Sequence, residues 1–144
     1  MKIDVEEIPA AQLEQIYGKP TKNTYLKVSL HGQSFIYHQI RKMMGMLIQS
    51  LQEGLDECFM DNSFCNNKMP VWLAPSEGLL LNRLLFQSYN QKKGIAETME
   101  LTAEEEAQIE EFKVENIYKC ILAFEEEQKV FTNWIVDYKK NNPY

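Results

Sequence analysis

Arg41 is the residue whose type and position most clearly suggest chemistry. It lies at the start of a predicted helix, just behind the aromatic residues Phe35 and Tyr37, in the run SFIYHQIRKMMGMLIQSLQEG of residues 34–54. A cation in the first helical turn opposes the positive end of the helix dipole, which costs roughly a few tenths of a kcal/mol. Arg41 therefore either points into water or pairs with an anion. That anion could be a carboxylate or a phosphate, because a guanidinium stays charged and presents a planar fork of donors.

His38, directly before this helix, is the other titratable candidate. We interpret it as a helix-start histidine bonded to the backbone, because no acid or nucleophile lies near it in the sequence to support a general base. Ser34 and Ser76 occur in no nucleophile-elbow pattern, and the sequence has no glycine-rich phosphate loop. The residues alone thus predict a folded domain with one unexplained arginine.

The cysteines and histidines argue against disulfides and zinc. The three cysteines, at positions 58, 65 and 120, are an odd number at irregular spacings, which favours a reducing, intracellular setting over a disulfide scaffold. Two histidines and the absence of a CxxC pair predict no metal site. No apolar run approaches the length of a membrane span, and the first residues, MKIDVEEIPA, contain no apolar stretch of the signal-peptide type.

Length and composition predict one folded domain. The chain has 144 residues, of which 44% are hydrophobic and 11% aromatic, enough for a real core. The net charge of −6 is uneven: residues 1–94 carry 10 Lys and Arg against 9 Asp and Glu, whereas residues 95–144 carry 5 against 12. Phosphate would be repelled by the second part, so any nucleic acid should meet the first. Charge alone does not indicate a nucleic-acid partner.

The pattern of the first half predicts a strand followed by an amphipathic helix. Residues 24–32 alternate as a half-buried strand, and residues 33–37 are expected to resume as extended chain. The helix of residues 38–53 places apolar side chains at i, i+3, i+4 and i+7 spacing, with Gly54 as its stop. Gly45 inside this helix costs roughly 1 kcal/mol relative to alanine, so we expect another backbone to approach closely there.

The remaining segments predict loops, a further strand and helices. Residues 78–86, GLLLNRLLF, form a short continuous apolar run, which favours a strand buried on both faces in a sheet shared with residues 24–37. Thr102 and Glu105 form a capping box ahead of a long helix. The acidic runs 104–106 and 125–127 are interpreted as solvated faces. The other expected elements are an edge strand within 2–8, a helical turn within 11–18, a long loop over 56–77 and a helix over 130–140.

Three segments resemble a known enzyme family. GQSFIYHQIRKMMGMLI, residues 32–48, resembles the F-x-x-HQIRKM-x-G segment of eukaryotic tRNA pseudouridine synthases of the TruA type. APSEGLLLNRLLFQSYN, residues 74–90, resembles the P-x-x-GL-x-L strand of the family's nuclear and mitochondrial branch. EEFKVENIYKCILAFEEEQKVFTNWI, residues 110–135, is similar to the C-terminal helices of that branch. The segments occur in the family's order.

The resemblance implies an α+β fold of the pseudouridine synthase type, in which a mixed or antiparallel sheet has helices packed on it. It implies isomerisation of uridine to pseudouridine in tRNA or other structured RNA, by breaking the N-glycosidic bond and remaking it through carbon, with no cofactor and no metal. By motif position, Arg41 would pair with the catalytic aspartate and Leu79 would line the pocket of the target base. The family further implies an intracellular location, in the nucleus or the mitochondrion, without a membrane. The resemblance leaves the oligomeric state open.

One departure from the family pattern qualifies this expectation. The catalytic aspartate of the family follows Arg-Thr far upstream, and none of the four aspartates of this chain, Asp4, Asp56, Asp61 and Asp137, follows Arg-Thr. We therefore expect residues 1–144 to be a single domain that forms the C-terminal portion of the catalytic region of a longer enzyme, inactive by itself. The alternative is a short non-catalytic module that keeps the fold and binds RNA or protein.

Overall fold

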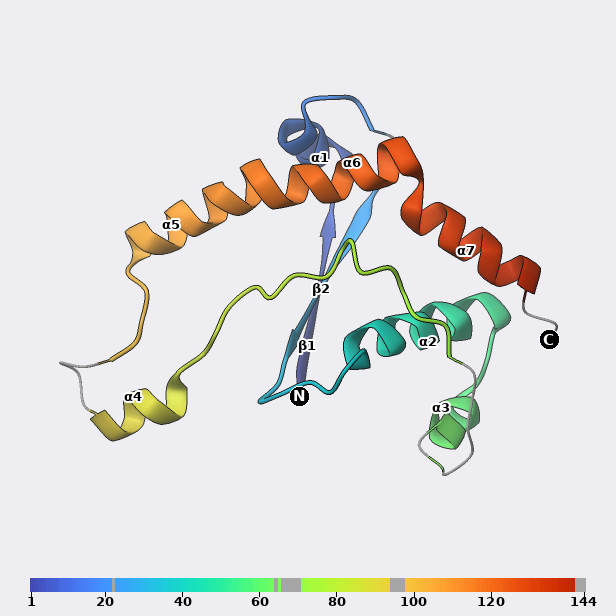
Figure 1. Cartoon of the computed structure of the whole chain (residues 1–144), viewed down its shortest axis with the longest axis horizontal. Helices are drawn as coiled ribbons and strands as arrows, with labels where there is room; N and C mark the ends of the chain where they lie inside the picture. Colours follow the sequence, from blue (N-terminus) through green and yellow to red (C-terminus); the bar gives the residue numbers. More distant parts are fainter. Residues whose placement is uncertain (22, 64, 66–70, 94–97, 142–144) are drawn as a thin grey trace. The chain divides into compact units, whose positions relative to one another are not determined.

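The computed structural model describes residues 1–21, 23–63, 65, 71–93 and 98–141 (Figure 1). The chain divides into two compact units. Unit 1 comprises Met1–Glu7, Leu26–Leu79 and Phe124–Tyr144, and unit 2 comprises Ile8–Tyr25 and Leu80–Ala123. The elements in chain order are β1 (Lys2–Ile8), α1 (Ala10–Tyr17), β2 (Tyr25–His31), α2 (Gln39–Glu53), α3 (Glu57–Ser63), α4 (Gln87–Lys93), α5 (Ala103–Phe112), the π-helix η2 (Lys113–Tyr118), α6 (Lys119–Gln128) and α7 (Val130–Asn141).

Strands β1 and β2 form a two-stranded sheet. Lys27 Nζ lies 2.8 Å from Glu6 Oε2, and His31 Nε2 lies 3.4 Å from Asp4 Oδ2. The residue numbers fall along β1 as they rise along β2, so the two strands run antiparallel. The predicted strands within 2–8 and 24–32 are confirmed, and a sheet accompanied by helices confirms the α+β class in its coarse form.

The prediction that residues 33–37 belong to a sheet together with residues 24–32 is wrong. The chain bends after Gly32 and enters a turn at Tyr37, with no strand between β2 and α2. A strand needs partners for its backbone N–H and C=O groups. Strand β2 pairs with β1, and residues 33–37 form no ladder with either strand.

The prediction of a buried strand over residues 78–86 is also wrong. This segment adopts no strand, and Leu81 is 75% exposed, while Leu84 and Leu85 are more than half exposed. The described sheet consists of β1 and β2, and neither strand forms a ladder with this segment, so its backbone N–H and C=O groups have no strand partner. An apolar run shows that a segment is suited to burial, but the covering surface has to come from other parts of a molecule.

Helix α2 forms as its periodicity predicts, but the face that it buries is not the predicted apolar one, because Leu47 is 42% exposed and Leu51 is 71% exposed. Gly45, Met46 and Gln49 are its buried residues. Gly54 ends the helix in the left-handed conformation, with a φ of 62°, and its N–H donates to Ser50 O. Glycine adopts this conformation without the steric penalty of a Cβ atom, so the predicted stop is confirmed.

Helix α7 joins α2 in the core of unit 1. The Tyr138 hydroxyl is hydrogen-bonded to Glu53 Oε1 at the end of α2. The Tyr138 ring meets the Trp72 ring edge-on, with the centroids 5.5 Å apart. Edge-to-face packing of this kind is favourable for aromatic pairs. The loop that carries Trp72 is therefore fixed between two helices of the same unit.

Helix α5 of unit 2 begins at the predicted capping box. Glu105 N donates to Thr102 Oγ1, and Thr102 N donates to Glu105 Oε2 at 2.8 Å. The hydrogen bonds that the Glu105 carboxylate accepts from Thr102, chiefly from the backbone N–H and then from the hydroxyl, lower the pKa of that carboxyl. Farther along, η2 contacts α1, and Leu13 of α1 and Leu122 of α6 are buried in this unit.

Glu125 overturns part of the interpretation of the acidic runs. The run 104–106 is exposed, as predicted, but Glu125 is only 5% exposed. Its Oε2 accepts from Phe131 N at 2.8 Å and from Thr132 N at 3.3 Å, and its Oε1 is bonded to the Thr132 hydroxyl. The first N–H groups of a helix have no partner within the helix. Glu125 therefore caps the N-terminus of α7.

Replacing Glu125 with alanine should lower the free energy of unfolding by about 1–2 kcal/mol, because the first turn of α7 loses its cap. Urea unfolding of the chain measures this change. Glu111→Ala makes the same chemical change at an exposed position of α5 and should stay within about 0.5 kcal/mol of the original chain. Equal losses for the two variants would contradict the capping role.

Candidate active site

The start of α2 is fixed by a tight turn around His38. His38 is the N-cap residue and has a φ of 63°, in the left-handed region that histidine enters more readily than most residues. Gln39 N donates to Ile36 O at 3.0 Å, and Ile36 N donates to Gln39 Oε1 at 2.9 Å. These reciprocal hydrogen bonds turn the chain into the helix, so Arg41 falls in the first turn, as predicted.

The His38 imidazole does not cap the helix. Its ring stacks on Tyr37, with the centroids 3.6 Å apart. Its carbonyl oxygen accepts from Lys42 N at 2.9 Å. His38 is thus a helix-start histidine, but it is bonded to the backbone through its own carbonyl rather than through its ring.

Arg41 is held by a backbone segment far along the chain, in the same unit. Its Nε donates to Ala74 O at 2.6 Å. The Ala74 N–H donates in return to Arg41 O at 3.2 Å. A carbonyl oxygen has two lone pairs, so Arg41 O can accept this bond and still serve its own helix. The pair of bonds fixes both the backbone and the side chain of Arg41.

The guanidinium of Arg41 is therefore engaged along one edge. Among the residues that the structure describes, its bond to Ala74 is the one hydrogen bond of the side chain, and no ion pair involves it. The sequence left two alternatives, water or an anion, and the structure adds a backbone carbonyl as the first partner. The two Nη atoms stay available as a fork that could receive an anion.

The close backbone approach predicted at Gly45 is confirmed. A methyl group placed on Gly45 would lie 1.8 Å from the carbonyl oxygen of Trp72 and 3.6 Å from Ala74 N. Atoms that are not bonded do not approach as closely as the first of these distances. Glycine is therefore the residue that fits while the Trp72–Ala74 backbone follows this path.

Leu79 lies at the end of a turn shortly after Ala74. Its N–H donates to Ser76 O at 2.9 Å, and the residue is 50% exposed. A methyl group on Gly78 would lie 3.1 Å from the ring of Phe131, so this turn rests against α7. The structure thus brings Arg41 to the loop that carries Leu79. The role of Leu79 in a base pocket stays a prediction.

Sequence reasoning missed Trp72 and Ala74 as members of this site. Both contribute backbone atoms, and a carbonyl or an N–H leaves no trace in residue type. Gly45 was the available signal, because a glycine inside a helix indicates that something approaches closely. It could not indicate which segment approaches, since α2 and this loop are separated along the chain.

The other candidate groups from the sequence do not add to this site. Cys58, Cys65 and Cys120 carry free thiols and are exposed. Among the described residues, no group of three or more His, Cys, Asp or Glu side chains could hold a metal ion. Over the same residues, no helix combines the length and the apolar character that crossing a membrane would require.

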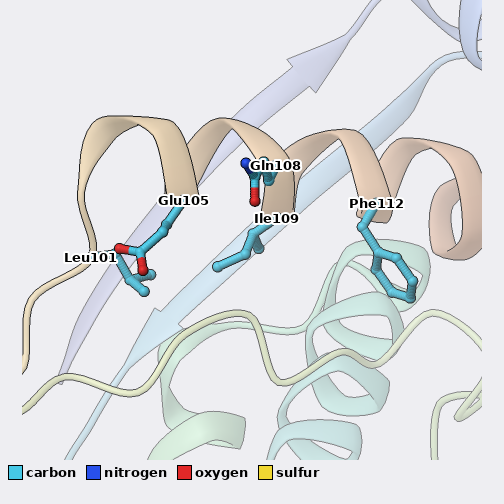
Figure 2. Close-up of a pocket in the computed structure, with 5 residues that line it drawn as sticks. All are labelled: Leu101, Glu105, Gln108, Ile109 and Phe112. Atoms are coloured by element: carbon cyan, nitrogen blue, oxygen red, sulfur yellow. The ribbon is translucent and has the colours of Figure 1, made fainter.

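Unit 2 contains hollows that lack the predicted site residues. A shallow hollow of about 330 Å³ lies along α5, where Leu101, Ile109 and Phe112 project from the same side (Figure 2). A larger one of about 870 Å³ is lined by residues 81–84 and 99–101 together with α5. Arg83 at its rim is paired with Glu106 at 2.7 Å. The charge that could attract a ligand there is thus already neutralised.

Comparison with known proteins identifies the family. The family model described as tRNA pseudouridine synthase matches residues 2–83, a range that includes both Arg41 and Leu79. The human Pseudouridylate synthase 1 homolog is 34% identical over 111 residues. The tRNA pseudouridine synthase 1 of Candida albicans is 35% identical over 109 residues, and that of Schizosaccharomyces pombe is 32% identical over 110. The chain belongs to the tRNA pseudouridine synthase family.

The matches cover most of this chain but a small part of each relative. The aligned residues are 75% of this chain and 26% of the human protein. They are 74% of this chain and 18% of the Candida albicans protein, and 74% and 20% for Schizosaccharomyces pombe. The chain therefore spans about a quarter or less of the length of these relatives.

Proposed function

We propose that this chain supplies part of the active site of an enzyme that converts uridine to pseudouridine in tRNA or other structured RNA. The observation that carries the proposal is the family match over residues 2–83, which contains the arginine and leucine motifs in order. In this reaction the bond from the ribose to N1 of uracil breaks, and a bond from the ribose to C5 forms with loss of the C5 hydrogen. No cofactor and no metal takes part.

Arg41 is assigned the role of partner to the catalytic aspartate, which belongs to a segment that this sequence does not contain. The hydrogen bond from Nε to Ala74 O leaves the Nη fork in a fixed direction, and this supports the assignment. A guanidinium at close range favours the ionised carboxylate and lowers its pKa. The aspartate would thereby be kept charged and aimed at the reacting nucleoside.

Leu79 is assigned to the wall of the pocket that receives the target base. Its exposure, and its place in a turn at the end of the loop held by Arg41, are compatible with contact to the face of a flat base. An RNA-modifying enzyme has to take its target base out of the stack and enclose it, and apolar side chains contribute to that enclosure.

The finer features of the fold also belong to this proposal. Residues 1–144 would form part of one catalytic domain, with a mixed or antiparallel sheet and helices packed on it. The exposed strand β1 and the exposed apolar segment 78–86 support a larger sheet in the complete enzyme. The family resemblance extends the proposal to an intracellular enzyme of the nucleus or the mitochondrion.

The 144-residue chain by itself should release no tritium from tRNA labelled at C5 of uridine. The family's chemistry needs a carboxylate, and no aspartate of this chain follows Arg-Thr. Loss of a covalent or acid–base participant lowers rates by orders of magnitude. The tRNA pseudouridine synthase 1 of Saccharomyces cerevisiae serves as the positive control. Turnover by the purified chain would show that another of its groups performs the role of the aspartate.

The same assay separates the proposal from its alternative. A complete enzyme that joins this sequence to the aspartate-bearing segment should release tritium. If the complete protein binds tRNA but releases none, the chain is a binding module that keeps the fold without the chemistry.

A further inference from the structure

The absence of a side chain at residue 45 sets the path of the backbone opposite α2. The Trp72 carbonyl oxygen occupies the space in which a Cβ atom of residue 45 would lie, 1.8 Å from its position. Restoring an ordinary van der Waals distance would displace the Trp72–Ala74 backbone by more than about 1 Å. The neighbouring ring of Trp72 packs on Tyr138, so this loop is not free to move away without cost.

The same short loop holds Arg41. Ala74 O accepts from Arg41 Nε at 2.6 Å, and Ala74 N donates to Arg41 O at 3.2 Å. A displacement of about 1 Å would bring both contacts outside the range of a hydrogen bond, which ends near 3.2–3.5 Å. Residues 41 and 45 are one helical turn apart and lie on the same side of α2. The space at Gly45 and the contacts of Arg41 are thus coupled through two residues of backbone.

We propose that Gly45 is a positioning residue for Arg41. By leaving room for the Trp72–Ala74 backbone, it allows Ala74 to clamp Arg41 by its Nε and its carbonyl, so that the Nη fork points in one direction. Its functional consequence rests on the role of Arg41 proposed above. The clamp itself depends only on the geometry of unit 1.

A purely structural role for Gly45 makes a different prediction. In that case alanine at this position would loosen the packing of α2, and Arg41 would keep its contact with Ala74. Alanine is the better helix former of the two residues. If Gly45→Ala lowers the stability of the chain, the loss therefore arises from the contact with the loop and not from the helix itself.

The side-chain Nε–H groups provide a direct measurement, because the chain has two arginines, Arg41 and Arg83. Nitrogen-15 NMR of the chain should show two Nε signals, assigned with Arg83→Lys. The Arg41 Nε–H is bonded to a carbonyl in a partly buried site, whereas Arg83 is exposed and uses Nη2 to meet Glu106. The Arg41 proton should therefore exchange with water about tenfold more slowly, or slower still.

Gly45→Ala should remove this protection. The Arg41 Nε–H should then exchange at a rate close to that of Arg83, while the Arg83 signal stays unchanged. Met46→Ala is the matched control, since it removes a buried side chain from the same helix without placing atoms against Trp72. It should lower the melting temperature and leave Arg41 protected. A folded Gly45→Ala chain with full Arg41 protection would overturn the proposal.

The unsubstituted chain also tests the proposal if Gly45→Ala fails to fold. An Arg41 Nε–H that exchanges as fast as that of Arg83 in the original sequence would mean that no clamp exists. In the complete enzyme, Gly45→Ala should lower kcat by roughly 10- to 100-fold with little change in KM, as expected for a misaimed group. If Gly45→Ala removes the protection of Arg41 but leaves turnover unchanged, the catalytic role of Arg41 is refuted. The proposal that Gly45 allows Ala74 to hold Arg41 would still stand.

Discussion

Arg41→Lys in the complete enzyme should lower kcat by about 100-fold or more, with KM nearly unchanged. Lysine keeps the positive charge but has a single ammonium group, which cannot bond Ala74 O and present a two-pronged fork at the same time. Loss of one preorganised donor at a reacting centre has effects of roughly this size. The measurement is the initial rate of tritium release at several tRNA concentrations, which gives kcat and KM.

Arg83→Lys is the matched control for this experiment. Arg83 is the other arginine of the chain, and it pairs with Glu106. Exposed ion pairs of this kind contribute little, so both turnover and stability should be nearly unchanged. In the 144-residue chain, Arg41→Lys should lower the free energy of unfolding by about 0.5–1.5 kcal/mol, the net contribution of one hydrogen bond. A loss above about 3 kcal/mol, with turnover intact, would make Arg41 a structural residue.

Leu122→Ala should lower the free energy of unfolding of the chain by about 2–5 kcal/mol. Leu122 is 5% exposed, so its removal leaves a cavity that the surroundings fill only in part. Leu81→Ala deletes the same atoms from an exposed residue of the same unit and should change this free energy by less than about 0.5 kcal/mol. Urea unfolding with comparison of the m-values measures both changes.

The comparison of Leu122 and Leu81 tests the corrected view of residues 78–86. A large loss for Leu81→Ala in the 144-residue chain would mean that this segment is buried after all. A large loss that occurs only in the complete enzyme would instead support the proposed larger sheet, in which another strand covers the segment.

Local features were predictable from the sequence because they depend on neighbouring residues. The capping box of Thr102 and Glu105 and the glycine stop at Gly54 were predicted and are present. Gly45 inside α2 indicated the close approach of another backbone, and this approach is present. In each case the signal lies within about one or two turns of the residue that it concerns.

Features that need a distant partner were mispredicted or missed. Residues 78–86 have the composition of a buried strand but no ladder partner, so composition alone led to the wrong assignment. Glu125 was interpreted as a solvated charge, but it caps α7, because the break between α6 and α7 at Lys129 brings the N–H groups of residues 131 and 132 to its carboxylate. Burial and hydrogen bonding of this kind depend on which segments meet, and residue type does not specify that.

The sequence by itself determined the family and indicated Arg41 as a candidate site residue, because motifs record residue types in order along the chain. Only the tertiary structure decided how Arg41 is held. Its partners are the carbonyl and N–H of Ala74, which every residue except proline possesses and no motif can encode. The space for that contact is provided by Gly45, because this residue has no side chain.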